Sequence, residues 1–190
     1  MTTLERGFKA WSERTSNLIR KELDTVQDAA LDLSKLADYL GIKIWTPNDV
    51  PGIEKNDLQE LLENSWNEWY GVGLQDGDQS VVIYNPRQSK RRQASDIAHE
   101  LAHFLLEHEP ARIILSESET LAQIWLRSYD QKQEDEANCL AWSLLVPRDG
   151  LAKLIRLRLS QEQIAEKFGV SEQLVKFRIN STGIRKQYRH

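Results

Sequence analysis

The stretch Asp96-Ile-Ala-His99-Glu100-Leu-Ala-His103-Phe-Leu-Leu106 contains two histidines four residues apart, with a glutamate directly after the first. Residues four apart lie on one face of an α-helix, so both imidazole rings can bind the same metal ion. The other positions hold a stripe of apolar residues, which predicts a helix over about 93–107 that packs on a core. This His-Glu-x-x-His stretch therefore predicts a helix that presents two metal ligands.

Glu100 lies about 100° around that helix from His99, so its carboxylate is expected beside the metal rather than on it. A carboxylate in that place can act as the general base that takes a proton from a zinc-activated water. The alternative is an amphipathic helix with two surface histidines. The chain has only four histidines, however, and two of them fall in this register, which favours the metal site.

A third ligand must come from a second helix, and the pattern predicts one over 133–145. Glu134 and Asn138 share a face of it, so Glu134 can bind the metal while Asn138 accepts a hydrogen bond from the far ring nitrogen of a ligand histidine. Two alternatives stay open: Glu136 is a competing ligand, and these acidic residues could form only a solvated first turn. Zinc is the expected ion, because two imidazoles and a carboxylate leave one position for water.

The two predicted helices also resemble a known family. His99-Glu-Leu-Ala-His-Phe-Leu-Leu106 is followed about 30 residues later by Glu134-Asp-Glu-Ala-Asn-Cys-Leu-Ala-Trp-Ser-Leu-Leu-Val-Pro147. These stretches resemble the ImmA/IrrE family of metallo-endopeptidases, HExxH zinc proteases of the gluzincin type, and the resemblance spans about residues 30–180. It implies a zincin-like fold with His99, His103 and Glu134 as zinc ligands and Glu100 as the catalytic acid and base.

The resemblance also implies a kind of substrate. Several members of the family cleave a helix-turn-helix transcriptional repressor encoded nearby, so a protein of this kind is the expected partner. Asn138 stands where many zincins have aspartate, and its amide adds no negative charge, which implies weaker metal binding or a less basic ligand histidine. No oxyanion-stabilising residue can be assigned, although Tyr129 and His108 are candidates.

The rest of the chain predicts an α+β fold. Residues 1–28 are expected to form an N-terminal helical extension, and residues 29–150 the zinc metallopeptidase domain. In this domain a small antiparallel sheet should pack on helices, with strands near 42–47, 69–74 and 80–84. Residues 111–129 have a mixed pattern that is partly helical and could form a loop that gates the site.

Residues 151–190 are expected to form a helical tail that resembles a helix-turn-helix over 160–179. Ser160 and Ser171 are suited to cap two helices, and Gly169 to the turn between them. The tail holds nine Lys/Arg and three Asp/Glu, a net charge of +6, whereas the first 150 residues hold 16 and 26, a net of −10. Lys176 and Arg178 could therefore enter a DNA groove through residues 160–180, but substrate docking or structural capping is the favoured role.

The composition indicates a cytoplasmic globular protein. A single cysteine, Cys139, excludes an internal disulfide and fits a reducing compartment. No apolar run approaches the roughly 18–20 residues needed to cross a membrane, and no signal peptide is evident. We therefore expect a zinc endopeptidase that acts on a specific intracellular protein. The alternative is a DNA-binding regulator with a vestigial or structural metal site, which would have no need for the general base Glu100.

Overall fold

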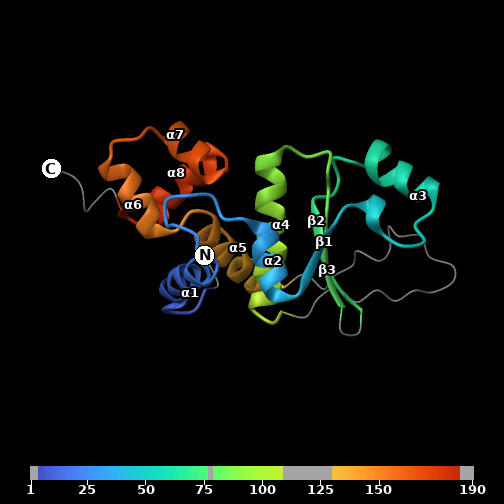
Figure 1. Ribbon diagram of the computed structural model, residues 1–190, viewed down its shortest axis with the longest axis horizontal. Coiled ribbons are helices and arrows are strands. Elements are labelled where there is room, and N and C mark those ends of the chain that lie inside the picture. The colour runs from blue at the N-terminus through green and yellow to red at the C-terminus, as the bar shows by residue number, and fades with distance from the viewer. Residues whose placement is uncertain (1–3, 77–78, 109–129, 185–190) are drawn as a thin grey trace.

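The computed structural model describes residues 4–76, 79–108 and 130–184, and it has an α+β architecture. A small sheet and α3 (Lys55–Gln59) lie at one end of the molecule, and the tail helices α6 (Arg148–Arg156), α7 (Gln161–Phe168) and α8 (Glu172–Ser181) at the other (Figure 1). Helices α4 (Lys90–Leu105) and α5 (Gln131–Leu145) lie between them, with α1 (Phe8–Glu22) and α2 (Leu33–Leu40) alongside. Within the described ranges, no helix is both long and apolar enough to span a membrane.

The sheet is mixed rather than antiparallel. Strands β2 (Gly71–Asp76) and β3 (Gln79–Tyr84) form the expected antiparallel hairpin, with Gly73 opposite Val82. Strand β1 (Ile42–Trp45) pairs in parallel with β3, which gives the strand order β1-β3-β2. The prediction of an antiparallel sheet was therefore wrong for β1. A hairpin can be predicted because its turn residues are local in sequence. The parallel pairing of β1 instead requires the chain to cross over between β1 and β3, which no local pattern reveals.

Helices α4 and α5 pack closely because small residues lie between them. Ala98 and Ala102 of α4 and Ala137 and Ala141 of α5 are at most 1 % exposed. Both helices begin earlier than expected because polar residues cap them: the Ser89 side chain accepts the Arg92 N–H, and Asp130 accepts from the second and third residues of α5. This close pairing brings the two predicted ligand-bearing helices side by side.

Helix α1 satisfies carbonyl groups at the end of α5, where the backbone has no partner within the helix. The Ser16 hydroxyl donates to the Ser143 carbonyl at 2.7 Å, and the fully buried Arg20 guanidinium donates to the Leu144 carbonyl at 2.9 Å. Burial lowers the pKa of Arg20 to about 10, so it is still charged at neutral pH. The buried face of α1 is therefore largely polar: it holds Ser12, Ser16 and Arg20 together with Ile19, whereas Trp11 and Leu18 are 37 % and 61 % exposed.

The tail contains the two capped helices that the sequence predicts. Ser160 forms a capping box on α7, Gly169 has a φ of 67°, and Ser171 caps α8. Apolar residues of both helices are buried in one core cluster that also includes residues of α1, α2, α4 and α5. Arg178 is buried as well: its Nε donates to the Val146 carbonyl at 2.9 Å, and its guanidinium pairs with Glu13 of α1. The core is thus continuous across the expected boundaries of the N-terminal extension and the tail.

Candidate metal centre

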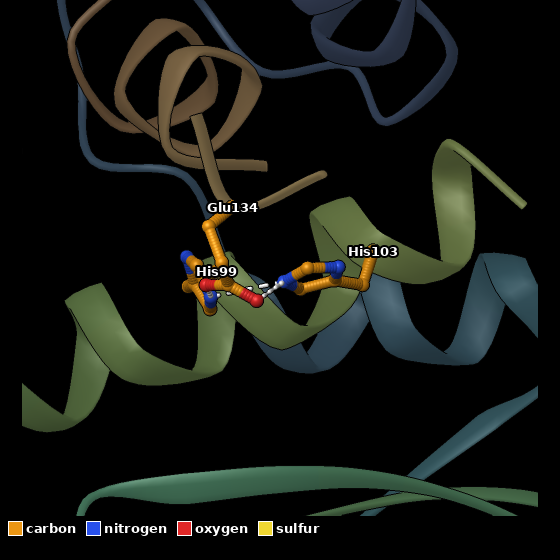
Figure 2. A group of neighbouring side chains, drawn as sticks. All are labelled: His99, His103 and Glu134. Atoms are coloured by element: carbon orange, nitrogen blue, oxygen red, sulfur yellow. Dashed lines mark hydrogen bonds and ion pairs between the residues drawn. The ribbon is translucent and has the colours of Figure 1, made fainter. Parts of the chain in front are cut away.

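Three predicted ligands converge between α4 and α5 (Figure 2). The His99 Nε2 atom lies 3.0 Å from His103 Nε2 and 3.2 Å from Glu134 Oε2, and His103 Nε2 lies 3.5 Å from Glu134 Oε1. Ligands on a tetrahedral zinc ion, with bonds near 2.0–2.1 Å, lie about 3.3 Å from one another. The separations and the mixture of two imidazoles with one carboxylate therefore fit a zinc ion of that geometry.

The charges at this cluster are strongly coupled. Hydrogen bonds with His103 and His99 hold the pKa of the Glu134 carboxyl far below its usual range. Burial lowers the pKa of His99, but its hydrogen bonds to Glu134 and Asn138 and the charges of Glu100 and Glu134 outweigh burial and raise that pKa. Glu134 therefore stays ionised at neutral pH, the form in which a carboxylate binds a cation.

The structure distinguishes the two acidic candidates on α5. Glu134 lies with the histidines, whereas the Glu136 Oε2 atom lies 3.3 Å from His108 Nε2 and outside the cluster. His108 Nδ1 lies 2.9 Å from His103 Nδ1. Both ring nitrogens of His108 thus have partners, which speaks against the oxyanion-stabilising role considered for it. Tyr129, the other candidate for that role, lies outside the described residues.

Asn138 lies one helical turn beyond Glu134 and hydrogen-bonds His99. Its amide contributes to the raised pKa of that imidazole, so its oxygen accepts from the ring. Such a contact orients the ring without adding charge.

Glu100, the predicted general base, is 9 % exposed and is held by the neighbouring sheet. Its Oε2 atom accepts the backbone N–H of Gly73 in β2 at 2.8 Å. A Cβ atom at Gly73 would lie 2.9 Å from Phe104 Cε2 and 3.1 Å from this same oxygen, so a methyl group there would push against both side chains. Sequence reasoning missed Gly73, although Gly71-Val-Gly73 within a strand is a signal of close backbone approach.

We expect Gly73→Ala to lower the rate of substrate cleavage about tenfold or more while leaving the metal content unchanged, because the added methyl group displaces the Glu100 carboxylate. The comparison is kcat/KM and metal content of the variant against wild type. Gly71→Ala is a matched control, since a Cβ there meets no atom closer than 3.5 Å. Equal losses in both variants would show that general disturbance of β2, rather than contact with Glu100, is responsible.

Comparison with known proteins agrees with this geometry. The family model described as the IrrE N-terminal-like domain of peptidase M78 matches residues 59–180. The matched region contains all of the metal cluster and Glu100, and it continues through α7 into α8. Among curated proteins there is no significant match, so the assignment rests on the family model and the geometry.

Proposed function

Because this chain belongs to the peptidase M78 family of metalloproteases, we propose that it is a zinc endopeptidase that cleaves a specific intracellular protein, a helix-turn-helix transcriptional repressor being the favoured substrate. The observation that supports the proposal most strongly is the position of Glu100 next to the cluster of His99, His103 and Glu134. A purely structural metal site would have no use for a buried carboxylate beside its ligands. The choice of a repressor as substrate rests on the family resemblance.

The residues of the site divide the chemistry between them. Zinc held by His99, His103 and Glu134 would lower the pKa of a water molecule and polarise the scissile carbonyl. Glu100 would take the proton of the attacking water and return it to the leaving amine. The Gly73 N–H keeps the Glu100 carboxylate oriented, and burial of Glu100 limits competition from bulk water.

An extended peptide could bind along β2, the edge strand of the described sheet. The Asn85 N–H donates to Tyr70 O, just before β2 begins. In an antiparallel pair every second residue bonds to the opposite strand, so Val72 and Leu74 are the residues of β2 that bond to β3. Gly71 and Gly73 therefore direct their backbone groups away from β3, and the Gly73 N–H does reach Glu100. A substrate strand added at this edge would run beside the general base, which supports a polypeptide as substrate.

Metal analysis tests the foundation of the proposal. We expect about one zinc ion per chain by elemental mass spectrometry, and a loss of affinity greater than about 100-fold in Glu134→Ala, since losing only an outer hydrogen-bond partner of a ligand costs about 10–100-fold. Asp135→Ala is the matched control, because this carboxylate of the same helical turn hydrogen-bonds Gln131 and lies outside the cluster. Poor zinc loading of the wild-type protein, even with zinc supplied, would refute the proposal.

A cleavage assay tests the substrate. The zinc-loaded protein is incubated with purified helix-turn-helix repressors, and new chain ends are identified by mass spectrometry with and without a chelator. We expect one or a few defined cuts in one repressor, abolished by the chelator and restored by zinc. If only other proteins were cleaved, the endopeptidase activity would stand and the repressor would be rejected as its substrate.

The DNA-binding alternative has less support. Arg178, one of two tail residues expected in a DNA groove, is 5 % exposed and is committed to Glu13 and the Val146 carbonyl. Lys176 is exposed, but one lysine neutralises one phosphate and gives little affinity by itself. The contacts of α8 support the role of structural capping.

A further inference from the structure

The hydrogen-bond chain behind His103 extends beyond the metal ligands. His103 Nδ1 contacts His108 Nδ1, and His108 Nε2 contacts Glu136 Oε2. We propose that His108 and Glu136 are positioning residues that hold His103 in the tautomer and orientation needed to bind the metal. The inference rests on the proposed zinc site and adds two residues to it.

The direction of every hydrogen bond in this chain follows from metal binding. The Nε2 atom of His103 faces His99 and Glu134, so it must keep its lone pair for the ion and the ring proton must lie on Nδ1. That proton is donated to His108 Nδ1, which places the His108 proton on Nε2. The Nε2–H then donates to the Glu136 carboxylate at 3.3 Å, so each atom has one role and the chain ends on a negative charge.

The end of α4 is shaped to place His108 over His103. The His108 N–H donates to the His103 carbonyl at 3.0 Å, and the Glu107 N–H donates to the Phe104 carbonyl at 3.1 Å. These two bonds form a Schellman motif, in which Glu107 takes the left-handed conformation with φ 54°. Glycine is usual at the position that Glu107 occupies. The turn brings His108 back towards the last turn of α4, next to His103.

The hydrogen-bond chain from His103 to Glu136 is buried and therefore shielded from water. The side chains of His103, His108 and Glu136 are 5 %, 8 % and 14 % exposed, respectively. The second oxygen of Glu136 lies 3.9 Å from Lys132 Nζ, so a positive charge lies near the end of this hydrogen-bond chain. Water competes little with hydrogen bonds in such a place, so their geometry can fix the ring.

The two ligand histidines are thus supported differently. His99 contacts the neutral amide of Asn138, whereas His103 is connected through His108 to a carboxylate. A carboxylate at the end of the chain raises the basicity of the ligand imidazole. The chain on His103 therefore supplies the negative charge that Asn138 lacks.

The test compares His108→Ala with His108→Gln. A glutamine can accept from His103 through its oxygen and donate to Glu136 through its nitrogen, whereas alanine can do neither. We expect His108→Ala to weaken zinc binding about 10–100-fold in chelator competition and to shift the visible absorption bands of the cobalt-loaded protein. His108→Gln should restore most of the affinity and the wild-type bands, and Glu107→Gln, at the exposed neighbouring residue, should leave both unchanged.

A double-mutant comparison separates positioning from folding. Glu136→Ala should weaken zinc binding in the wild-type background and have little further effect in His108→Ala, because the two residues act through one chain. Zinc affinity of His108→Ala within twofold of wild type, or equal losses in His108→Ala and His108→Gln, would overturn the inference. Failure of the wild-type protein to bind zinc would instead refute the metal site itself.

Discussion

Replacing Glu100 with Gln is expected to reduce substrate cleavage about a thousandfold or more while leaving zinc bound. The amide has nearly the same shape as the carboxylate, and its oxygen can still accept the Gly73 N–H, so the site should keep its structure. It cannot take a proton from water at neutral pH, which removes the general base from the reaction. The measurement is kcat/KM on the cleaved protein, with zinc content determined in the same samples.

The zinc content decides how this result is interpreted. Loss of activity with full zinc and an unchanged melting temperature would assign Glu100 to the chemical step. Loss of zinc together with activity would mean that the carboxylate supports the metal centre instead. A fully active variant would show that another group acts as the base.

The largest expected effect on stability is that of Gly150→Ala. A Cβ atom at position 150 would lie 1.8 Å from the carbonyl oxygen of Gln27 and 2.6 Å from its carbonyl carbon. These are backbone atoms that cannot rotate away, so α6 must separate from the segment after α1. We expect a loss of about 3 kcal/mol or more in the free energy of unfolding, measured by urea denaturation.

Gly52→Ala provides the matched control for this stability experiment. Gly52 has a φ of 76°, and a Cβ atom added there would meet no other atom within 4 Å, so alanine adds only backbone strain of about 1 kcal/mol. If the two variants lose equal stability, steric contact with Gln27 is not the cause, and the close approach of α6 to residue 27 would be less tight than its distances indicate.

Local rules accounted for the helices and for the register of the site. The spacing of His99 and His103 places both rings on one face of any α-helix, whatever surrounds it. Capping by Ser160 and Ser171 and the left-handed turn at Gly169 are equally local, and the structure contains all three. The family assignment has the same origin, because it depends on the pattern along the chain.

Contacts between distant segments could not be obtained in this way. Glu134 and Glu136 are both plausible ligands by spacing, and only the packing of α5 on α4 places the first with the histidines and the second with His108. The parallel pairing of β1 with β3 and the contact of Gly73 with Glu100 likewise join residues far apart in sequence.

The buried face of α1 shows the difference most clearly. This face buries Ser16 and Arg20 beside Ile19, because the end of α5 presents carbonyl groups that need donors, and local spacing does not predict which polar residues will find such partners. The sequence by itself determined which segments are helical and which face of α4 presents metal ligands, since both follow from a fixed number of residues per turn. Only the tertiary structure decided which groups meet across helices. Those contacts depend on close packing and on the pairing of buried polar groups between segments that are far apart in sequence, and local patterns do not say which segments become neighbours.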